Sequence, residues 1–169
     1  MIRVGPLADS SLRARRIARA PLVVVASPEC LARHGEPDVL AAVARLPCLA
    51  YGAPGTSRWH CARPDEPLLD VNTVFAADDM ETLREVALAG IGFALLPRFV
   101  AGRDIESGTL RVLRLSRDLD PGEVHAVFPG HRLLSRGARS LAQFLQQRIA
   151  RLPHWIGEPT TDHEQEAKL

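Results

Sequence analysis

Residues 77–97 read ADDMETLREVALAGIGFALLP, and this stretch carries the clearest secondary-structure signals in the chain. Asp78 followed three residues later by Glu81 has the form of a helix capping box. Apolar residues then recur at helical spacing on one side of the segment: Met80, Leu83, Val86, Ala87 and Gly90. The pattern predicts a helix over about 79–89, and the fully apolar run at 91–96 predicts a buried strand directly after it.

A second apolar run, LVVVA at 22–26, lies upstream of this stretch. A continuous β-branched run is typical of a strand covered on both faces, so we expect a central strand here. Ser27 and Pro28 follow as an N-cap and a proline at the first helical position, which predicts a short helix to about Arg33. Strands alternating with helices place the chain in the α/β class.

The remaining predicted elements are mostly short. We expect a helix at 39–44 capped by Asp38, a helical turn at 97–101, and a last helix at 136–152 capped by Ser135. The last helix is expected to turn these side chains inward: Leu141, Phe144, Leu145, the stem of Arg148, Ile149 and Leu152. Extended segments are predicted at 2–4, 46–51, 58–63, 68–75, 110–115 and 123–128.

Composition indicates one globular domain of 169 residues with a packed core, since 46% of the residues are hydrophobic. The formal net charge is +1, and every basic residue except Lys168 is an arginine. GC-rich codon usage explains this bias, so the arginines are weak evidence for nucleic-acid binding. A basic cluster near the N-terminus favours the solvated face of a strand or loop over an anion site: Arg3, Arg13, Arg15, Arg16 and Arg19.

Several function classes are disfavoured by what the sequence lacks. No apolar run approaches the length of a membrane span and no signal-peptide layout opens the chain, so we expect a cytoplasmic protein without membrane contact. The odd number and wide spacing of Cys30, Cys48 and Cys61 fit neither a disulfide framework nor a zinc site. The segment 157–169 is acidic and nearly free of apolar residues, which predicts a disordered tail.

No pattern of catalytic, metal-binding or nucleotide-binding residues stands out. The six histidines show no helical pair spacing for a metal, and a glycine pair at 90 and 92 lacks the third glycine of a dinucleotide fingerprint. His60 and Cys61 are neighbours on a predicted strand, so their side chains point to opposite faces and cannot easily share a proton. We therefore expect no enzyme activity, no metal and no cofactor.

Asp78 and Asp79 are better explained as helix-capping residues than as an acid/base pair. Ligand binding at the same place is compatible with capping, because exposed N–H groups at a helix start can hold a carboxylate and the aspartates could hold an amine or hydroxyl. Trp59 and Trp155 are each as consistent with core packing as with a ligand wall.

A series of ordered phrases resembles the effector-binding domain of LysR-type bacterial transcription regulators from residue 2 to about 152. The strongest is the 77–97 stretch with SGTL at 107–110. The others are IRVGPL at 2–7, DSSL at 9–12, ARRI at 14–17, VVASP at 24–28, LARHG at 31–35, LPCL at 46–49, Trp59 and HAVFP at 125–129.

This resemblance implies a fold of the periplasmic-binding-protein type 2 kind, in which a small-molecule effector binds between two Rossmann-like subdomains. Residues 21–122 would form the second subdomain. The first would be partial, with remnant strands at 1–20 and a return strand and helix at 123–152, followed by a tail at 153–169. The effector-binding residues carried over by position are Gly5, Pro6, Ala77, Asp78, Asp79, Gly92 and Phe93.

The function implied is ligand sensing within a transcription regulator. The full-length protein would form a homo-oligomer and bind DNA through a helix-turn-helix that this chain lacks. Acidic side chains at 78 and 79, where the family usually has a small polar or amide residue near 78, would select against a plain carboxylate effector. Two alternatives stay open: a solute-binding protein or enzyme on the same fold, and a non-functional truncated remnant.

Overall fold

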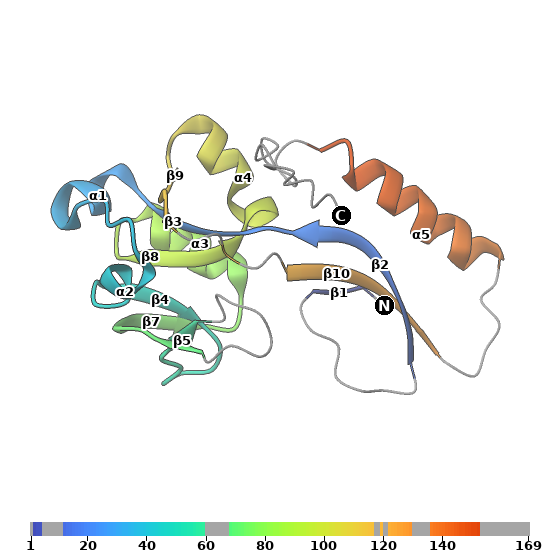
Figure 1. The fold of residues 1–169 in the computed structure, drawn as a ribbon, viewed down its shortest axis with the longest axis horizontal. Helices are drawn as coiled ribbons and strands as arrows, with labels where there is room; N and C mark the ends of the chain where they lie inside the picture. The colour runs from blue at the N-terminus through green and yellow to red at the C-terminus, as the bar shows by residue number, and fades with distance from the viewer. Residues whose placement is uncertain are drawn as a thin grey trace, which may run out of the picture.

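Two sheets organise the chain in the computed structural model, which describes residues 2–4, 12–59, 68–116, 119, 122–129 and 136–152 (Figure 1). A five-stranded sheet has the order β7-β4-β8-β3-β9, and a three-stranded sheet has the order β1-β10-β2. A two-stranded ribbon, β5-β6, accompanies the larger sheet. The α/β class predicted from the sequence is confirmed.

The larger sheet is mixed, and its strand directions define the edge that matters for function. Its strands are β3 (Leu22–Ala26), β4 (Cys48–Tyr51), β7 (Thr73–Ala77), β8 (Phe93–Pro97) and β9 (Arg111–Val112). β4 runs parallel to β7 and β8, whereas β3 is antiparallel to β8 and β9. The last residues of the three parallel strands, Tyr51, Ala77 and Pro97, therefore lie along one side of the sheet, here named the carboxyl edge.

Both faces of this sheet are covered at its central strands, whereas Val74 and Phe75 on the edge strand β7 are exposed. One face packs with α1 (Pro28–His34) and α2 (Leu40–Val43), the other with α3 (Met80–Leu88) and α4 (Arg98–Ser107). Along β3, Val24 belongs to the first core and Val25 to the second. All five residues of β8 are buried. Strands covered on both faces were predicted from the apolar runs at 22–26 and 91–96. Both strands are present, but the second begins at Phe93, and Ile91 before it is 50% exposed.

The smaller sheet consists of β1 (Ile2–Val4), β10 (Gly122–Pro129) and β2 (Leu12–Ala20), and α5 (Arg136–Ile149) packs on it. β2 passes directly into β3 through Pro21. The core of this sheet is small and includes Ile17, Val124, Ala126 and Ala142. Arg15, Arg16 and Arg19 are exposed on β2, which confirms the predicted solvated strand face for these three arginines.

One predicted strand, 68–75, is wrong because the chain changes sheets within it. β6 (Leu69–Asp70) pairs with β5 (Arg58–Trp59), whereas β7 joins the larger sheet. The backbone N–H groups of Val71 and Asn72 donate to Ser57 and Ala44, on separate segments. These diverging hydrogen bonds end one strand and start the next. Most of the predicted 58–63 strand lies outside the described residues.

Two predicted caps are also wrong. Asp79, one residue later than expected, caps α3: its carboxylate accepts hydrogen bonds from Thr82 N at 2.8 Å and Thr82 Oγ1 at 2.7 Å. α2 begins after Val39 without a side-chain cap, so Asp38 does not have the expected role. The predicted cap of α1 is confirmed, since Ser27 Oγ accepts from Cys30 N at 3.2 Å.

α4 and α5 differ from expectation in length and orientation. The turn expected at 97–101 is a full helix of 10 residues. On α5 the buried residue is Ala142, while Leu141 and Phe144 are 58% and 60% exposed and Arg148 is exposed as well. The prediction that these three point inward is wrong. The expected cap, Ser135, lies outside the described residues. No helix in the described part of the chain is long and apolar enough to cross a membrane.

Candidate functional site

Two loops meet at the carboxyl edge. The loop after β4 starts at Gly52, whose N–H donates to the carbonyl of Ala77 at 2.9 Å, so it is tied to the end of β7. Tyr51 and Ala77 are also direct register partners. Gly52 has φ 143°, and a Cβ there would lie 2.6 Å from Thr56 Oγ1, so the tight return of this loop depends on glycine.

A cavity of about 330 Å³ opens where the β4 loop folds back. This is within the usual size range of sites for small metabolites. Tyr51 is 51% exposed, so its ring is available at the end of β4. The lining combines an aromatic ring, hydroxyls and one guanidinium: Tyr51, Gly55, Thr56, Ser57, Arg58 and Leu68.

Trp59 holds the far end of this loop in place. Its side chain is 2% exposed, and its indole Nε1 donates to the carbonyl of Leu49 at 2.8 Å. Of the two interpretations that the sequence left open, core packing is the one that this burial supports. Arg58 next to it is paired with Asp70 at 2.9 Å, so its charge is already partnered.

The aspartates after β7 differ in availability. Asp79 accepts hydrogen bonds from the Thr82 hydroxyl and from the N–H groups of Thr82 and Glu81, which hold the pKa of its carboxyl below the ordinary value. It is therefore ionised and occupied by the first turn of α3. Asp78 is exposed, and none of the described residues hydrogen-bonds to its carboxylate. Asp78 is thus the carboxylate that a ligand can reach.

Gly92 and Phe93 lie at the other end of the sheet from these aspartates. Phe93 is the register partner of Cys48, at the start of β4, and is 0% exposed. A Cβ on Gly92 would lie 2.6 Å from the carbonyl oxygen of Pro47, so this glycine permits close backbone packing. At about 3.3 Å per residue, β8 carries the chain roughly 13 Å from Phe93 to the carboxyl edge. The structure therefore does not bring these two residues together with Ala77, Asp78 and Asp79.

Two further points complete the predicted set. Gly5 and Pro6 lie outside the described residues. Arg98, which follows β8 at the carboxyl edge, donates its backbone N–H to the carbonyl of Pro21 at 2.7 Å, and its side-chain Nε is buried without a hydrogen-bond partner among the described residues. Sequence reasoning missed Tyr51, Thr56 and Arg98, because their placement depends on knowing which strands run parallel.

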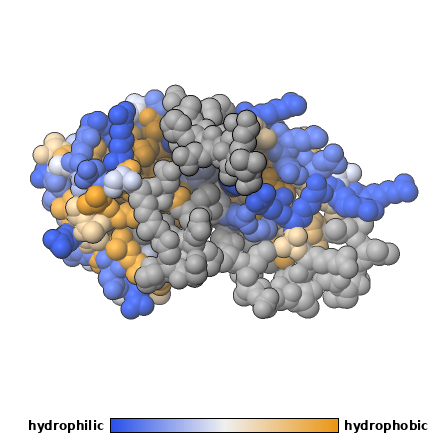
Figure 2. All heavy atoms as spheres, viewed as in Figure 1, coloured by the Kyte–Doolittle hydropathy of each residue, from blue (hydrophilic) through white to orange (hydrophobic). Residues whose placement is uncertain are grey.

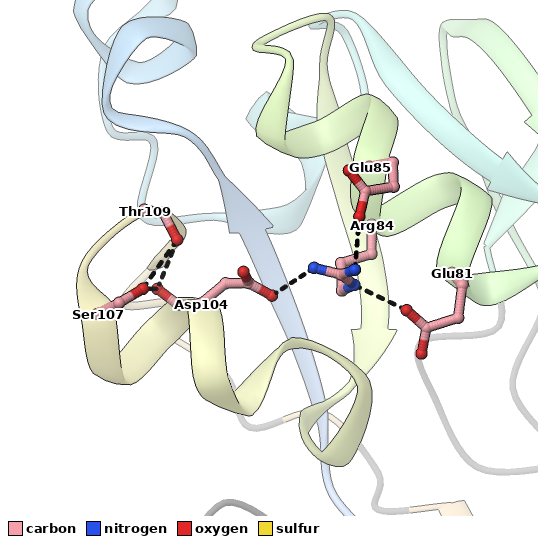
Figure 3. A network of polar contacts seen from close by, with 6 residues as sticks. All are labelled: Glu81, Arg84, Glu85, Asp104, Ser107 and Thr109. Carbon is pink, nitrogen blue, oxygen red and sulfur yellow. Dashed lines mark hydrogen bonds and ion pairs between the residues drawn. The ribbon is translucent and has the colours of Figure 1, made fainter.

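A polar network fixes α3 against α4 behind this edge (Figure 3). Arg84 on α3 reaches Asp104 on α4 at 3.0 Å and also pairs with Glu81 and Glu85 at 2.8 and 2.5 Å. The hydrogen bond to Glu81 and the neighbouring carboxylates raise the pKa of Arg84. The network therefore joins the second turn of α3 to the last turn of α4.

Metal chemistry has no visible basis in the described residues, where no group of three or more His, Cys, Asp or Glu side chains is placed to hold an ion. Cys30 and Cys48 are buried, and burial raises the pKa of the Cys30 thiol. A buried thiol with a raised pKa is a poor nucleophile.

Comparison with known proteins decides the family. The model of the LysR substrate binding domain matches residues 1–150. The chain belongs to this family. The regulatory domain of CrgA, a LysR-type transcriptional regulator from Neisseria meningitidis, is a structural neighbour of this LysR domain with a TM-score of 0.66 and 29% identity. The match covers 86% of this chain and 73% of that one, and it supports the predicted fold of the periplasmic-binding-protein type 2 kind.

Curated relatives of this LysR domain are transcription regulators. The HTH-type transcriptional regulator CrgA of Neisseria meningitidis serogroup C is 31% identical over 150 residues, covering 88% of this chain and 50% of the relative. The HTH-type transcriptional activator AaeR of Escherichia coli is 31% identical over 130 residues, covering 76% of this chain and 42% of the relative. The chain therefore spans about half the length of the curated relatives it matches.

Proposed function

We propose that this LysR domain senses a small-molecule effector at the carboxyl edge of its larger sheet. The observation that carries the proposal is the 330 Å³ cavity of the β4 loop, which Gly52 ties to Ala77 by a backbone hydrogen bond, in a chain of a substrate-binding-domain family. Tyr51 and Thr56 would contact the effector from the β4 loop, and Asp78 from the β7 loop. Gly5 and Pro6 remain proposed contacts, whereas for Gly92 and Phe93, at the opposite end of β8, we propose a packing role rather than contact with the effector.

The proposed division of labour follows the two sheets. Residues 21–122 would form one subdomain, and residues 1–20 with 123–152 would belong to the other. An effector bound between them would favour one relative orientation, because a ligand shifts a conformational equilibrium by its differential affinity for the two states. In the cytoplasmic, oligomeric regulator this change would reposition DNA-binding segments contributed from outside this chain.

The chemistry of the edge favours an amine or hydroxyl group over a plain carboxylate. Asp78 is unpartnered among the described residues and Asp79 is held in its ionised form, so the wall carries negative charge. The first N–H groups of α3 are already used by Asp79, which removes the donors that an anionic effector would need. Arg58 does not reverse this charge, since Asp70 neutralises it.

Calorimetric titration with three matched ligands tests this preference. Butylamine, butyramide and butyrate have the same carbon chain and differ in charge. We expect the amine to bind at least tenfold more tightly than the acid, and Asp78→Asn to reduce that ratio to below threefold. Glu106→Gln, which removes an exposed acid near the end of α4 and outside the cavity lining, is the control. Tighter binding of butyrate than butylamine would contradict the proposed selectivity.

A further inference from the structure

A second cavity of about 480 Å³ runs along β7, beside the cavity that carries the proposed function. The β4 loop separates the two, since Gly55, Thr56 and Ser57 line both of them. Every residue from 71 to 76 contributes to the second cavity, and none of its described lining residues is charged. The groups that a ligand would meet there are therefore apolar side chains, hydroxyls and the backbone of β7.

β7 is an edge strand of the larger sheet, and half of its backbone groups point away from that sheet. The Ala77 carbonyl accepts from the Gly52 N–H at 2.9 Å, so Ala77 bonds toward the β4 side. Because the direction alternates along a strand, Phe75 also bonds toward β4, whereas the N–H and C=O groups of Val74 and Ala76 point outward. No strand among the described residues pairs with these outward groups.

The two side chains in the middle of β7 are both exposed. Val74 and Phe75 point to opposite faces of the sheet, yet they are 49% and 38% exposed. Figure 2 shows hydrophobic surface at the lower left, where β4 and β7 lie in Figure 1. An unpaired strand edge with apolar side chains on both faces matches another extended backbone, which supplies hydrogen bonds together with alternating side chains.

Charges at the two ends of β7 set the direction of such a backbone. At the carboxyl end Asp78 is exposed. At the other end the exposed Arg45 lies beside Asn72, whose side-chain amide donates to the Arg45 carbonyl at 3.5 Å. A peptide antiparallel to β7 would place its α-ammonium near Asp78 and its α-carboxylate toward Arg45, whereas a parallel peptide would bring its carboxylate against Asp78. Charge complementarity therefore selects the antiparallel direction.

The cavity limits the occupant to a short, single strand. The β4 loop forms its other wall, so the space along β7 lies between a loop and a strand. Its volume is within the usual range of sites for small ligands. A nucleic-acid strand does not match the described lining, which offers no cation to its phosphates.

We propose that the effector of this LysR domain is a short peptide with a free α-amino group, bound as an added antiparallel strand along β7. This inference rests on the proposed function, because it gives Asp78 the same amine partner. In a tetrapeptide, the second and fourth residues would lie opposite Ala76 and Val74 and exchange pairs of backbone hydrogen bonds with them. The first residue would lie opposite Ala77, with its ammonium near Asp78, and the third side chain would pack on Phe75.

Calorimetric titration of the whole chain with the tetrapeptide Ala-Thr-Tyr-Val tests the hydrogen-bond pattern. N-methylation of its second residue removes the donor that faces the Ala76 carbonyl, so we expect binding to be at least tenfold weaker. N-methylation of its third residue, whose N–H points away from β7, should change the affinity less than threefold. N-acetylation removes the ammonium near Asp78 and should also weaken binding at least tenfold. Equal effects of the two methyl groups, or equal affinity of the acetylated peptide, would overturn the proposal.

Variants at Ala76 test the same hydrogen bonds from the side of the protein. Ala76→Pro removes an N–H that points away from β4, and proline is tolerated in an edge strand at such a position. We expect it to bind the tetrapeptide at least tenfold more weakly than the unaltered chain, whereas Ala76→Gly, which keeps the N–H, should bind within threefold. Unchanged affinity in Ala76→Pro, with an unchanged urea midpoint, would overturn strand pairing along β7. The methylated peptides carry the test if Ala76→Pro fails to fold.

Butylamine separates this proposal from the proposed function. It should bind the unaltered chain and Ala76→Pro equally, because an amine at Asp78 does not need the outward edge of β7. Butylamine binding that depends on Asp78, without binding of the tetrapeptide, would refute the peptide effector and leave the proposed sensing site in place. Absence of binding by both ligands would refute both.

Discussion

Replacing Arg84 by methionine should loosen α3 from α4 while leaving the apolar stem of the side chain in place. Arg84 and Asp104 are only 22% and 17% exposed, and their charged atoms lie 3.0 Å apart. The guanidinium also pairs with Glu81 and Glu85. Methionine removes the hydrogen bonds that connect the two helices and leaves the half-buried Asp104 carboxylate without its cation (Figure 3).

The expected cost lies between two limits. Exposed ion pairs contribute about 0.2–1 kcal/mol, and breaking a fully buried pair costs about 3–5 kcal/mol. Arg84 is partly buried, so we expect Arg84→Met to lower the free energy of unfolding by about 2 kcal/mol. For a chain of this size that corresponds to a fall in Tm of about 4–8 °C.

A double-mutant cycle of Arg84→Met with Asp104→Asn measures the interaction free energy between the two side chains. Urea denaturation of the two single variants and the double variant should give a coupling free energy of about 1 kcal/mol. Asp104→Asn keeps the backbone carbonyl that accepts from Ser107, Thr109 and Leu110, so the end of α4 is unaffected. Arg58→Met is the matched control, because Arg58 and Asp70 lie at a similar distance of 2.9 Å but are 60% and 79% exposed.

Either of two results would contradict the proposed role of the Arg84–Asp104 pair. A coupling free energy indistinguishable from zero would show that the Arg84–Asp104 contact does not join α3 to α4 energetically. A loss in Arg58→Met equal to that in Arg84→Met would show that burial does not set the strength of these ion pairs.

Two further predictions concern backbone packing and the α3 cap. Gly92→Ala should lower the free energy of unfolding by about 1–3 kcal/mol in urea denaturation, because its Cβ would lie 2.6 Å from the Pro47 carbonyl oxygen. Gly137→Ala is the control, since a Cβ at that position has no atom within 4 Å. Equal losses in the two variants would refute close backbone packing at Gly92. Asp79→Ala should lower the urea midpoint of unfolding at pH 7. Because the folded pKa of Asp79 lies below the ordinary value of 3.8, the loss of stability should persist as the pH falls to about 3.8 and disappear at lower pH. A loss of stability that stays the same at lower pH would contradict an ionised cap.

Local patterns predicted the elements whose partners are close in sequence. The helical period after residue 79 predicted α3, and the apolar run at 91–96 predicted β8. A continuous apolar run identifies β8 because all five of its residues are buried. The cap moved from Asp78 to Asp79 because both residues satisfy the same sequence rule and only the backbone geometry separates them.

Long-range arrangement was not predictable in the same way. Nothing local marks the change of sheet at Val71 and Asn72, which depends on hydrogen bonds to Ser57 and Ala44. Gly92 and Phe93 lie away from Asp78 because of the direction in which β8 runs beside β4. The family resemblance did not give the directions of the strands for individual residues. The apolar period of α5 predicted that its large hydrophobic side chains face inward. The helix instead buries the small side chain of Ala142 and exposes that of Phe144.

The most direct test of the central claim is to map where a ligand binds on this LysR domain. Amide chemical shifts of the isotope-labelled chain would be followed during titration with butylamine. We expect saturable shifts concentrated at 51–58 and 77–82, with little change at 91–93. Shifts concentrated at 91–93 and α1, or scattered along the chain without saturation, would contradict a sensing site at the carboxyl edge.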